Sequence, residues 1–479
     1  MTSRVWRFGM GDSGTPPEPA ARVVGGKGAG LLTMSRLGLP VPPGFVIATE
    51  VCDAYYALHQ SFPDGLKDEV ATALAALEAT LGQSFGDPSN PLLVSVRSGA
   101  PASMPSMMDT ILNLGLTRAT LAGLTARIGE VAEDCYLRLH ESFDEQDKAL
   151  PQDPHEQLWV AIRSVLDSWQ SRRAVTYRDM HGIADKPGTA VTIQAMVFGN
   201  AGSDSGTGVA FTRDPATGAP EPFGEVLRNA QGEDMVGGTV TPQPIAVLAA
   251  AMPALYRDLT GHFRTLEQHF ASMQDIEFTI ERGKLWLLQT RTGVTNAEAA
   301  ARIAVDMVGE GLIDRARALA RVDLAALRRP PMATVASGTP LVKGLPASPG
   351  AVTGTVVFSS VEAEAAREPC ILVLPETRPQ DIPGIRAAAG VLTSRGGATS
   401  HAAVVARGIG RPCVVGAGAM HVDAVAGRLT VGAREVSRGA LLTIDGGTGC
   451  VFEGVLALHV PAPSAAVQTL LTWAAEADA

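Results

Sequence analysis

The sequence has no long apolar run and few cysteines. No stretch approaches the roughly 18–20 consecutive apolar residues that span a bilayer, and the first residues, MTSRVWRFGMGDSG, lack the apolar core of a secretory signal. The five cysteines are odd in number and contain no CxxC pair, which argues against a zinc site and against a disulfide framework. We therefore expect a cytoplasmic protein without a membrane anchor.

An excess of positive charge is also missing. The chain has 39 Lys and Arg residues against 49 Asp and Glu residues, a formal charge of −10 that argues against a surface for nucleic acid or anionic lipid. A local basic pocket for a phosphorylated small molecule remains compatible with this balance. With 46% hydrophobic and 18% charged residues the chain is globular in composition, and 479 residues predict two or three domains.

The clearest boundary is RRPPMATVASGTPLVK at 328–343, where Pro, Ser, Gly and Thr interrupt a run with helical spacing. We expect a large α+β domain over 1–327, a linker over 328–342, a β/α domain over 343–458 and a tail with a short helix over 459–479. The predicted fold class is therefore a multidomain α+β and α/β protein. A linker of about 14 residues reaches roughly 45–50 Å when it is extended.

One histidine has unusual neighbours. The stretch SRGGATSHAAVVARGIGRPCVVG at 394–416 places His401 behind two glycines and two hydroxyl residues. If a helix begins near Thr399 or Ser400, a hydroxyl can cap its first turn, and the helix dipole favours a neutral imidazole and then a phosphate dianion on it. The two glycines leave room for a bulky partner. A lone histidine is more often an exposed residue of a capped helix, but this pattern favours a phosphoryl carrier.

A second group of residues lies on a predicted β-hairpin, QDIEFTIERGKLWLLQTR at 274–291. Asp275 and Glu277 are two residues apart on a strand and share a face. A three-residue loop at 281–283 would place Gln289 opposite Asp275 on that face, whereas a two-residue loop would place it on the other. Two carboxylates and an amide oxygen suit Mg²⁺. The alternative is the exposed polar face of an amphipathic hairpin.

Two glycine-rich stretches carry weaker signals. GGKGAG at 25–30 does not follow the GxxxxGK[ST] pattern, and by itself it predicts a turn before a helix that begins near Gly28. Lys27 and Arg97 are nevertheless the residue types that neutralise a polyphosphate. In SDSGTGVAF at 203–211, two glycines would let backbone N–H groups approach anionic oxygens. The alternative is a flexible hairpin tip.

Taken together, these stretches resemble the pyruvate, phosphate dikinase family over residues 5–455. Phosphoenolpyruvate synthases are related, but they typically have Cys where this chain has Ser400, so the dikinases are the closer match. The resemblance is carried by GGKGAGLLTMSRLGLPVPPGFVIATEVC, VSVRSGAPASMPSMMDTILNLGL, QAMVFGNAGSDSGTGVAFTRDPATG, NAQGEDMVGG, MQDIEFTIERGKLWLLQTR, KGLPASPGAVTGTVVF and GGATSHAAVVARGIGRPCVVG.

The resemblance implies an ATP-grasp nucleotide-binding domain followed by a swivelling phosphohistidine domain of β/β/α type. It makes His401 the phosphoryl carrier, and it matches Thr399 to a threonine that is phosphorylated for regulation in plant dikinases. The loop 203–208 resembles one that closes over the triphosphate. The residues implied to bind ATP are Lys27, Arg97, Ser205, Thr207, Gly208, Glu233, Asp275, Glu277, Gln289 and Arg291, of which Lys27 and Arg97 also act in catalysis and Asp275, Glu277 and Gln289 also bind Mg²⁺.

The sequence also departs from the family pattern. The family continues into a C-terminal TIM barrel that binds pyruvate or phosphoenolpyruvate, which we expect this chain to lack. The stretch 117–150 looks shorter than in the family, and Ser106 and Ala398 stand where Gly and Met are usual. These departures leave the first half of the family reaction in place and put the second half in doubt.

The resemblance implies a phosphotransferase with paired acceptors. ATP, with inorganic phosphate, would phosphorylate His401, which would pass the phosphoryl group to pyruvate or to another acceptor, bound by a separate barrel protein. Two alternatives stay open. One is a non-catalytic, nucleotide-binding regulatory homologue, and the other is a phosphotransferase for a specialised small molecule.

Overall fold

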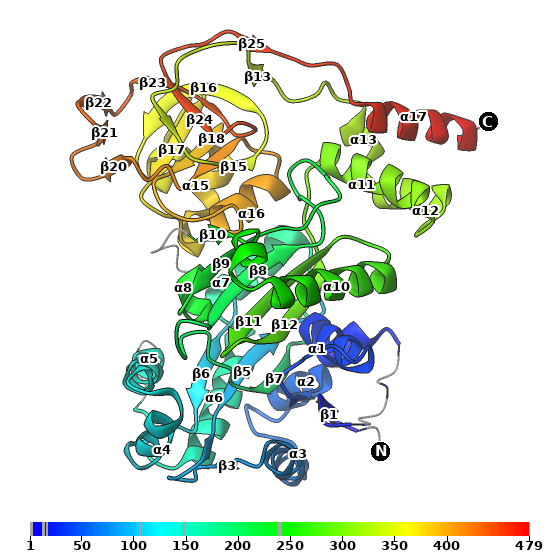
Figure 1. Cartoon of the computed structure of the whole chain (residues 1–479), viewed down its shortest axis with the longest axis vertical. Coiled ribbons are helices and arrows are strands. Elements are labelled where there is room, and N and C mark those ends of the chain that lie inside the picture. The colour runs from blue at the N-terminus through cyan, green and yellow to red at the C-terminus, as the bar shows by residue number, and fades with distance from the viewer. Residues whose placement is uncertain are drawn as a thin grey trace. The chain divides into compact units, whose positions relative to one another are not determined.

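The computed structural model divides into two compact units, which are drawn in Figure 1. One comprises residues 1–206 and 277–291, and the other comprises 207–276 and 292–479. Ser106 lies outside the described residues. The structure describes residues 3–11, 15, 18–102, 104, 107–144, 146, 149–236 and 242–478.

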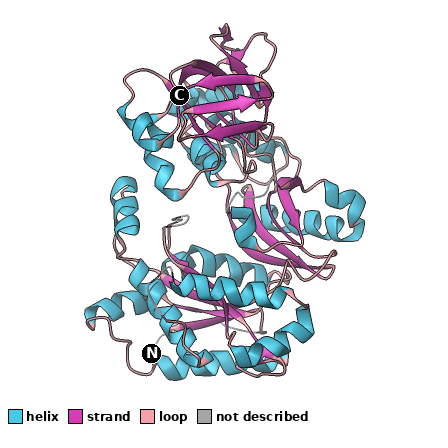
Figure 2. Ribbon diagram, turned by 90° about the vertical axis from the view of Figure 1, so that its left-hand side faces the viewer, coloured by secondary structure: helices cyan, strands magenta, loops and turns pink. Residues whose placement is uncertain are grey.

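The first unit is built on a five-stranded antiparallel sheet. Its strand order is β1-β2-β7-β5-β6, and the strands are β1 (Val5–Phe8), β2 (Gly44–Ile47), β5 (Val94–Gly99), β6 (Thr110–Leu114) and β7 (Ala190–Ala195). Helices α1 (Ala20–Arg36), α2 (Thr49–Ala57) and α6 (Pro154–Ser168) pack on it, and Figure 2 shows helices flanking its strands. Strands β2 and β7 are buried along their whole length. Both faces of these strands are therefore covered, so that even the polar Thr192 and Gln194 of β7 are buried.

The remaining elements of this unit are four helices and two short strands among the described residues. The stretch 117–150 forms two helices, the first of which begins with a capping box between Thr117 and Thr120. The bounds are α3 (Leu66–Leu81), β3 (Ser84–Phe85), β4 (Pro91–Leu92), α4 (Arg118–Ile128), α5 (Val131–Asp144) and α7 (Arg172–His181).

A second five-stranded sheet has the order β10-β9-β8-β11-β12. Its last two strands form a hairpin whose first strand begins in one unit and ends in the other. The bounds are β8 (Gly206–Phe211), β9 (Phe223–Arg228), β10 (Gln243–Pro244), β11 (Gln274–Glu281) and β12 (Lys284–Thr292), with helices α8 (Gly232–Val236), α9 (Val247–Ala251) and α10 (Pro253–Phe270).

The chain from residue 342 forms an eight-stranded sheet in the order β14-β24-β23-β16-β17-β18-β19-β15, together with a three-stranded sheet β20-β21-β22. The strands are β14 (Val342–Lys343), β15 (Leu345–Ser348), β16 (Ala351–Val357), β17 (Cys370–Leu374), β18 (Gly390–Thr393), β19 (Cys413–Val415), β20 (Met420–Asp423), β21 (Arg428–Val431), β22 (Arg434–Ser437), β23 (Leu441–Asp445) and β24 (Cys450–Glu453). The helices are α14 (Ser360–Ala365), η1 (Pro379–Asp381), α15 (Ile382–Ala387) and α16 (His401–Gly408). Strands β16 to β19 pair in parallel at the centre.

Alternation along β17 explains the layers of this region. Ile371 and Val373 pack into a cluster with residues of the three-stranded sheet. Cys370 and Leu372 point the other way, into a cluster that contains Ala403 of α16. Because successive residues of a strand face opposite sides, the eight-stranded sheet is sandwiched between a β layer and an α layer. The expected β/β/α arrangement is therefore present.

A helical cluster stands apart from these layers. It comprises α11 (Ala297–Gly309), α12 (Arg315–Arg321), α13 (Leu324–Leu327) and the C-terminal α17 (Ala465–Asp478), and the apolar side of α17 is buried in it through Val467 and Leu470. Short strands β13 (Thr334–Val335) and β25 (Leu458–His459) pair in antiparallel fashion. The segments that precede and follow the layered region therefore run side by side, as Figure 1 shows.

Candidate functional site

Three basic residues and one acidic residue meet in the first unit. Arg97 on β5 donates a hydrogen bond from Nη2 to Oε2 of Glu277 on β11 at 3.0 Å. Lys27 on α1 and Arg291 on β12 interact electrostatically with Glu277. Four of the residues expected to bind ATP are therefore brought together from four elements, and three cations face one carboxylate.

Close backbone contacts hold Lys27 in this position. Helix α1 has a break at Gly25, where φ is +69°, a conformation that favours glycine. A Cβ at Gly25 would lie 1.6 Å from the carbonyl oxygen of Gly99 at the end of β5. The next residue, Gly26, donates its N–H to the carbonyl of Ala100 at 3.0 Å. The element begins at Ala20, but its helical backbone is interrupted at Gly25, so a break does precede the helix that was expected to begin near Gly28, and the glycines also allow the backbone to approach the sheet closely.

The charges of the cluster perturb each other. Burial lowers the pKa of Lys27 to about 7, and the positive charge of Arg97 acts in the same direction. Burial alone would raise the pKa of Glu277, but the charges of Arg97 and Lys27 outweigh it and hold that pKa below its usual value. The carboxylate of Glu277 is therefore ionised at neutral pH, and an added anion would stabilise the protonated form of Lys27.

The hairpin has a two-residue loop, so the expected three-residue loop is wrong. Strand β11 ends at Glu281 and β12 begins at Lys284, and the intervening Arg282 and Gly283 have φ values of +48° and +74°. Two successive left-handed residues form the tight turn that matches the twist of a hairpin. This turn sets Glu281 opposite Lys284 and would therefore set Met273 opposite Thr292.

Beyond the ends of both strands, the N–H of Gly293 bonds to the carbonyl of Met273 at 3.0 Å, one residue further along than the turn would give. The end of the hairpin is therefore irregular. Arg291 on β12 nevertheless lies close enough to Glu277 for its positive charge to lower the pKa of that carboxyl group.

The two acidic residues of the hairpin have different surroundings. Asp275 is buried, with 5% of its surface exposed. Burial lowers the pKa of Arg407 on α16, and Asp275 is one of the acidic groups that oppose this shift. Glu277 is among the charged groups that act on Lys27, and its negative charge raises the pKa of that lysine. The expected metal ligand Gln289 is partly exposed on β12.

The glycine-rich loop is shorter than expected. Gly206, Thr207 and Gly208 begin strand β8 and are buried, because the β-branched residues of GTGVAF favour an extended chain. Ser205 is buried, and its Oγ accepts a hydrogen bond from the N–H of Arg282 at 2.9 Å. Its hydroxyl therefore holds the hairpin turn. Glu233 lies exposed on α8.

Helix α16 begins at His401, with Ser400 as its N-cap residue. The side chain of Ser400 makes no capping hydrogen bond, so the expected hydroxyl cap is absent at this residue. The backbone of His401 is described, and its side chain lies outside the described part. The free N–H groups before the helix are instead satisfied by a side chain from a distant strand.

That side chain is Glu225 on β9, which the sequence analysis missed. Its Oε1 accepts from the N–H of Ala398 at 2.6 Å, and its Oε2 accepts from the N–H of Thr399 at 3.0 Å and from the Thr399 hydroxyl. A Cβ at Gly397 would lie 2.2 Å from the same carboxylate. Burial raises the pKa of Glu225, and the hydrogen bonds from Thr399 and Ala398 oppose the rise. The only sequence signal is an acidic residue inside an apolar strand.

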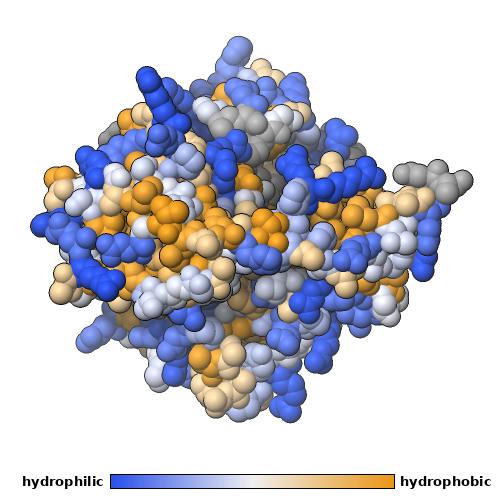
Figure 3. Space-filling view, turned by 90° about the horizontal axis from the view of Figure 1, so that it is seen from above, coloured by the Kyte–Doolittle hydropathy of each residue, from blue (hydrophilic) through white to orange (hydrophobic). Residues whose placement is uncertain are grey.

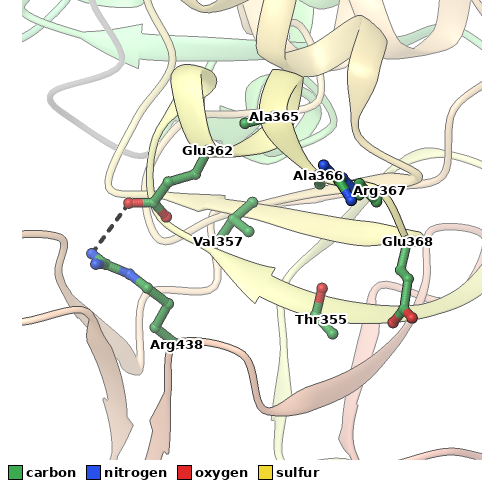
Figure 4. Close-up of a pocket in the computed structure, with 8 residues that line it drawn as sticks. All are labelled: Thr355, Val357, Glu362, Ala365, Ala366, Arg367, Glu368 and Arg438. Atoms are coloured by element: carbon green, nitrogen blue, oxygen red, sulfur yellow. Dashed lines mark ion pairs between the residues drawn. The ribbon is translucent and has the colours of Figure 1, made fainter.

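Surface features elsewhere involve other residues. A hollow of about 520 Å³ lies in the layered region. Figure 4 shows the residues that line it, which include an ion pair with Arg438 Nη2 3.3 Å from Glu362 Oε1. No residue expected to act in catalysis lines it. Figure 3 shows apolar residues set among hydrophilic ones on the face seen from above. Across the part of the chain that the structure describes, no helix has the length and apolar character needed to cross a membrane.

Comparison with known families gives two matches, which follow one another along the chain. A family model described as pyruvate phosphate dikinase, AMP/ATP-binding domain, matches residues 56–262 and 256–311. A model described as PEP-utilising enzyme, mobile domain, matches residues 366–449. The first contains Arg97 and both carboxylates of the hairpin, and the second contains His401.

Similar curated proteins carry the same name. A pyruvate, phosphate dikinase of Rhizobium meliloti is 44% identical over 99% of this chain and 60% of its own length. A chloroplastic pyruvate, phosphate dikinase of Flaveria pringlei is 43% identical over 98% of this chain and 55% of its own length. One from Rickettsia felis is 44% identical over 95% of this chain and 58% of its own length. The chain thus spans about three fifths of the length of these relatives.

Proposed function

The chain belongs to the pyruvate, phosphate dikinase family, and from this premise we propose that it is a phosphotransferase that moves a phosphoryl group from ATP to His401. The observation that carries the proposal is the cluster of Lys27, Arg97 and Arg291 around Glu277. Three cations against one carboxylate leave an excess of positive charge, which a polyphosphate would neutralise.

The proposed roles follow from charge and position. Lys27, Arg97 and Arg291 bind the phosphates and stabilise charge on the transferring group, where most catalysis of phosphoryl transfer arises. His401 is the nucleophile, because a neutral imidazole at a helix N-terminus can accept the phosphoryl group and the helix then favours the added anion. Ser205, Thr207 and Gly208, at the start of β8 and just before it, contact the nucleotide, as does Glu233.

We further propose that Mg²⁺ accompanies the nucleotide. No group of three or more His, Cys, Asp or Glu residues that could hold a metal occurs among the described residues. Mg²⁺ does not require such a cage, since one or two carboxylates and the substrate phosphates usually suffice. The ionised Glu277 fits this role, with Asp275 and Gln289 as the other proposed ligands. The metal would supply charge neutralisation on the phosphates.

The proposed reaction is the family reaction up to the phosphohistidine. Inorganic phosphate takes one phosphoryl group and leaves as pyrophosphate, AMP is released, and residues 343–458 carry the phosphoryl group on His401 away from a nucleotide domain over residues 1–327. The tether is the linker 328–342, and residues 459–479 are a tail. The final acceptor is pyruvate, bound by a separate barrel protein.

The first experiment labels the protein. The chain is incubated with Mg²⁺, inorganic phosphate and ATP labelled in its β-phosphate. We expect acid-labile label on the wild-type chain and on His421→Ala, which removes an exposed histidine of the same region. We expect none on His401→Ala, and equal labelling of that variant would overturn the proposal. Nucleotide binding without AMP formation would show a regulatory homologue instead.

A second measurement identifies the acceptor. The labelled chain is isolated and mixed with pyruvate, alone and together with a protein that provides a pyruvate-binding barrel. Loss of label to phosphoenolpyruvate only in the second mixture is the expected result. Loss of label with pyruvate alone would contradict the need for a separate barrel. Retention of label in both mixtures would contradict pyruvate as the acceptor.

A further inference from the structure

The contact between Glu225 and the loop before His401 joins two segments that are 174 residues apart in sequence. We propose that Glu225 is a positioning residue, whose carboxylate docks this loop onto β9 by accepting hydrogen bonds from the two backbone N–H groups that precede the N-cap of helix α16. The proposal rests on the proposed function, because it presupposes that His401 receives a phosphoryl group.

The contact uses both oxygens of the carboxylate. Its two oxygens take three hydrogen bonds, two from consecutive backbone N–H groups and one from a hydroxyl. A glutamine at 225 has one accepting oxygen and an NH₂ group that can only donate. It would therefore leave at least one backbone N–H of the loop facing another donor.

The fit leaves no room for a side chain at Gly397. A Cβ there would lie 2.2 Å from Oε2 of Glu225 and 2.4 Å from Oε1, well inside the distances that non-bonded atoms tolerate. The glycine before the histidine thus admits a carboxylate from β9. An alanine at this position would push the carboxylate away without changing any charge.

The loop is also held by a residue of the helix that follows it. Arg407 on α16, of which 1% is exposed, donates from Nη2 to the carbonyl of Ala398 at 2.9 Å and to that of Ala347 at 2.8 Å. The peptide groups of Ala398 are therefore fixed by Arg407 and by Glu225 together. Because only Ser400 separates Thr399 from His401, the place of the carboxylate determines where the backbone of the histidine stands.

Because Glu225 is buried, its carboxylate depends on the hydrogen bonds that the loop supplies. Glu225 is 5% exposed, and a buried carboxylate is stable only while it is hydrogen-bonded. Docking of the loop supplies these bonds, whereas a loop that leaves must be replaced by water. A docked loop and a carboxylate on β9 therefore stabilise each other, which is the property that a positioning contact requires.

The test measures phosphorylation rate and nucleotide affinity separately. In Glu225→Gln we expect the single-turnover rate of His401 labelling to fall by about tenfold or more, while the affinity for ATP changes by less than about twofold, because Lys27 and Arg97 are untouched. Glu225→Asp, which keeps both oxygens, should recover part of the rate. Glu221→Gln, an exposed glutamate four residues upstream, is the matched control and should label at the wild-type rate.

A second readout reports docking without phosphorylation. Hydrogen exchange of the peptide 395–402 should be faster in Glu225→Gln than in the wild type and in Glu221→Gln, because two of its amides lose their acceptor. Gly397→Ala should reproduce both effects with Glu225 intact, which protects the test if Glu225→Gln unfolds. Thermal unfolding checks that each variant is folded.

The outcomes separate the two proposals. A wild-type chain that never labels would overturn phosphorylation of His401, and the exchange comparison would still report whether Glu225 docks the loop. Wild-type labelling together with unchanged rates in Glu225→Gln and Gly397→Ala would overturn the positioning role alone. A loss of ATP affinity equal to the loss of rate would likewise overturn it, since a positioning residue for the histidine leaves nucleotide binding intact.

Discussion

Two regions of the molecule present groups that can bind an anion, and the groups differ in kind. Around Glu277 the groups that would meet an anion are side-chain cations on three separate elements, Lys27, Arg97 and Arg291. At the loop before His401 they are consecutive backbone N–H groups, and an acidic side chain, Glu225, already occupies them. The first region has an excess of positive charge. In the second region the backbone groups carry no net charge, and the carboxylate of Glu225 brings a negative one.

Because of this difference, the two regions should respond differently to pH and to small changes in backbone position. Side-chain cations repel each other and can lose a proton, so their strength depends on pH and on how closely the backbone brings them together. Backbone N–H groups carry no net charge and do not titrate, so a contact made by them depends on shape and on hydrogen-bond geometry. The predictions below test this contrast.

The largest effect is expected from Gly25→Ala. The new Cβ would meet the carbonyl of Gly99 and would strain a residue with φ of +69°, so the free energy of unfolding should fall by about 3–5 kcal/mol. Chemical denaturation measures this change. Gly38→Ala has a similar φ of +71° and nothing within 4 Å, and it should cost only about 1–2 kcal/mol. Equal costs would show that the approach of α1 to β5 does not hold Lys27 in place.

Next in size is Lys27→Met, which removes one cation of the cluster. Affinity for ATP should fall by about a hundredfold, the range expected for one charge-assisted contact to phosphate. Isothermal calorimetry measures the affinity, and the exposed Lys343→Met is the control. If both variants bound ATP as the wild type does, the cluster would not be the phosphate site.

The pH dependence should distinguish the two regions. Because the pKa of Lys27 is lowered to about 7, the free protein is largely deprotonated there at pH 8, and a bound polyphosphate should restore the proton. We expect uptake of up to one proton at pH 8 and almost none at pH 6, with affinity falling by up to about tenfold per pH unit above 7. Calorimetry in buffers of different ionisation enthalpy measures the uptake. Equal uptake by Lys27→Met would assign the proton to another group.

The smallest effect concerns the hydroxyl of Thr399. Thr399→Val removes one of the three hydrogen bonds to Glu225, and the labelling rate should fall by about fivefold, as for one neutral donor. Thr399→Ser keeps the hydroxyl and should remain within about twofold. If valine and serine behaved alike, the two backbone N–H groups would suffice to dock the loop.

Much of the fold could be predicted from local sequence. The hairpin about Gly283 and the helix that begins at His401 both follow from turn residues and periodicity, and the multidomain α/β class and the family are confirmed. Local patterns were wrong where Gly206 and Gly208 joined a strand, and they did not show that Gly25 serves close packing as well as a break in the helix. A glycine in the sequence does not show whether it forms a turn or allows another segment to pack closely against it.

The sequence alone determined which residue types the protein uses for its proposed chemistry, because a histidine behind small and hydroxyl residues, a lysine among glycines and paired carboxylates are written in short contiguous motifs. Only the tertiary structure decided that Glu277 joins the cations while Asp275 lies near Arg407, and that Glu225 meets Ala398 and Thr399. These choices depend on contacts between segments that are far apart in the sequence, such as the contact across 174 residues between Glu225 and Thr399. No local pattern encodes such contacts, because they form only when separate elements pack together.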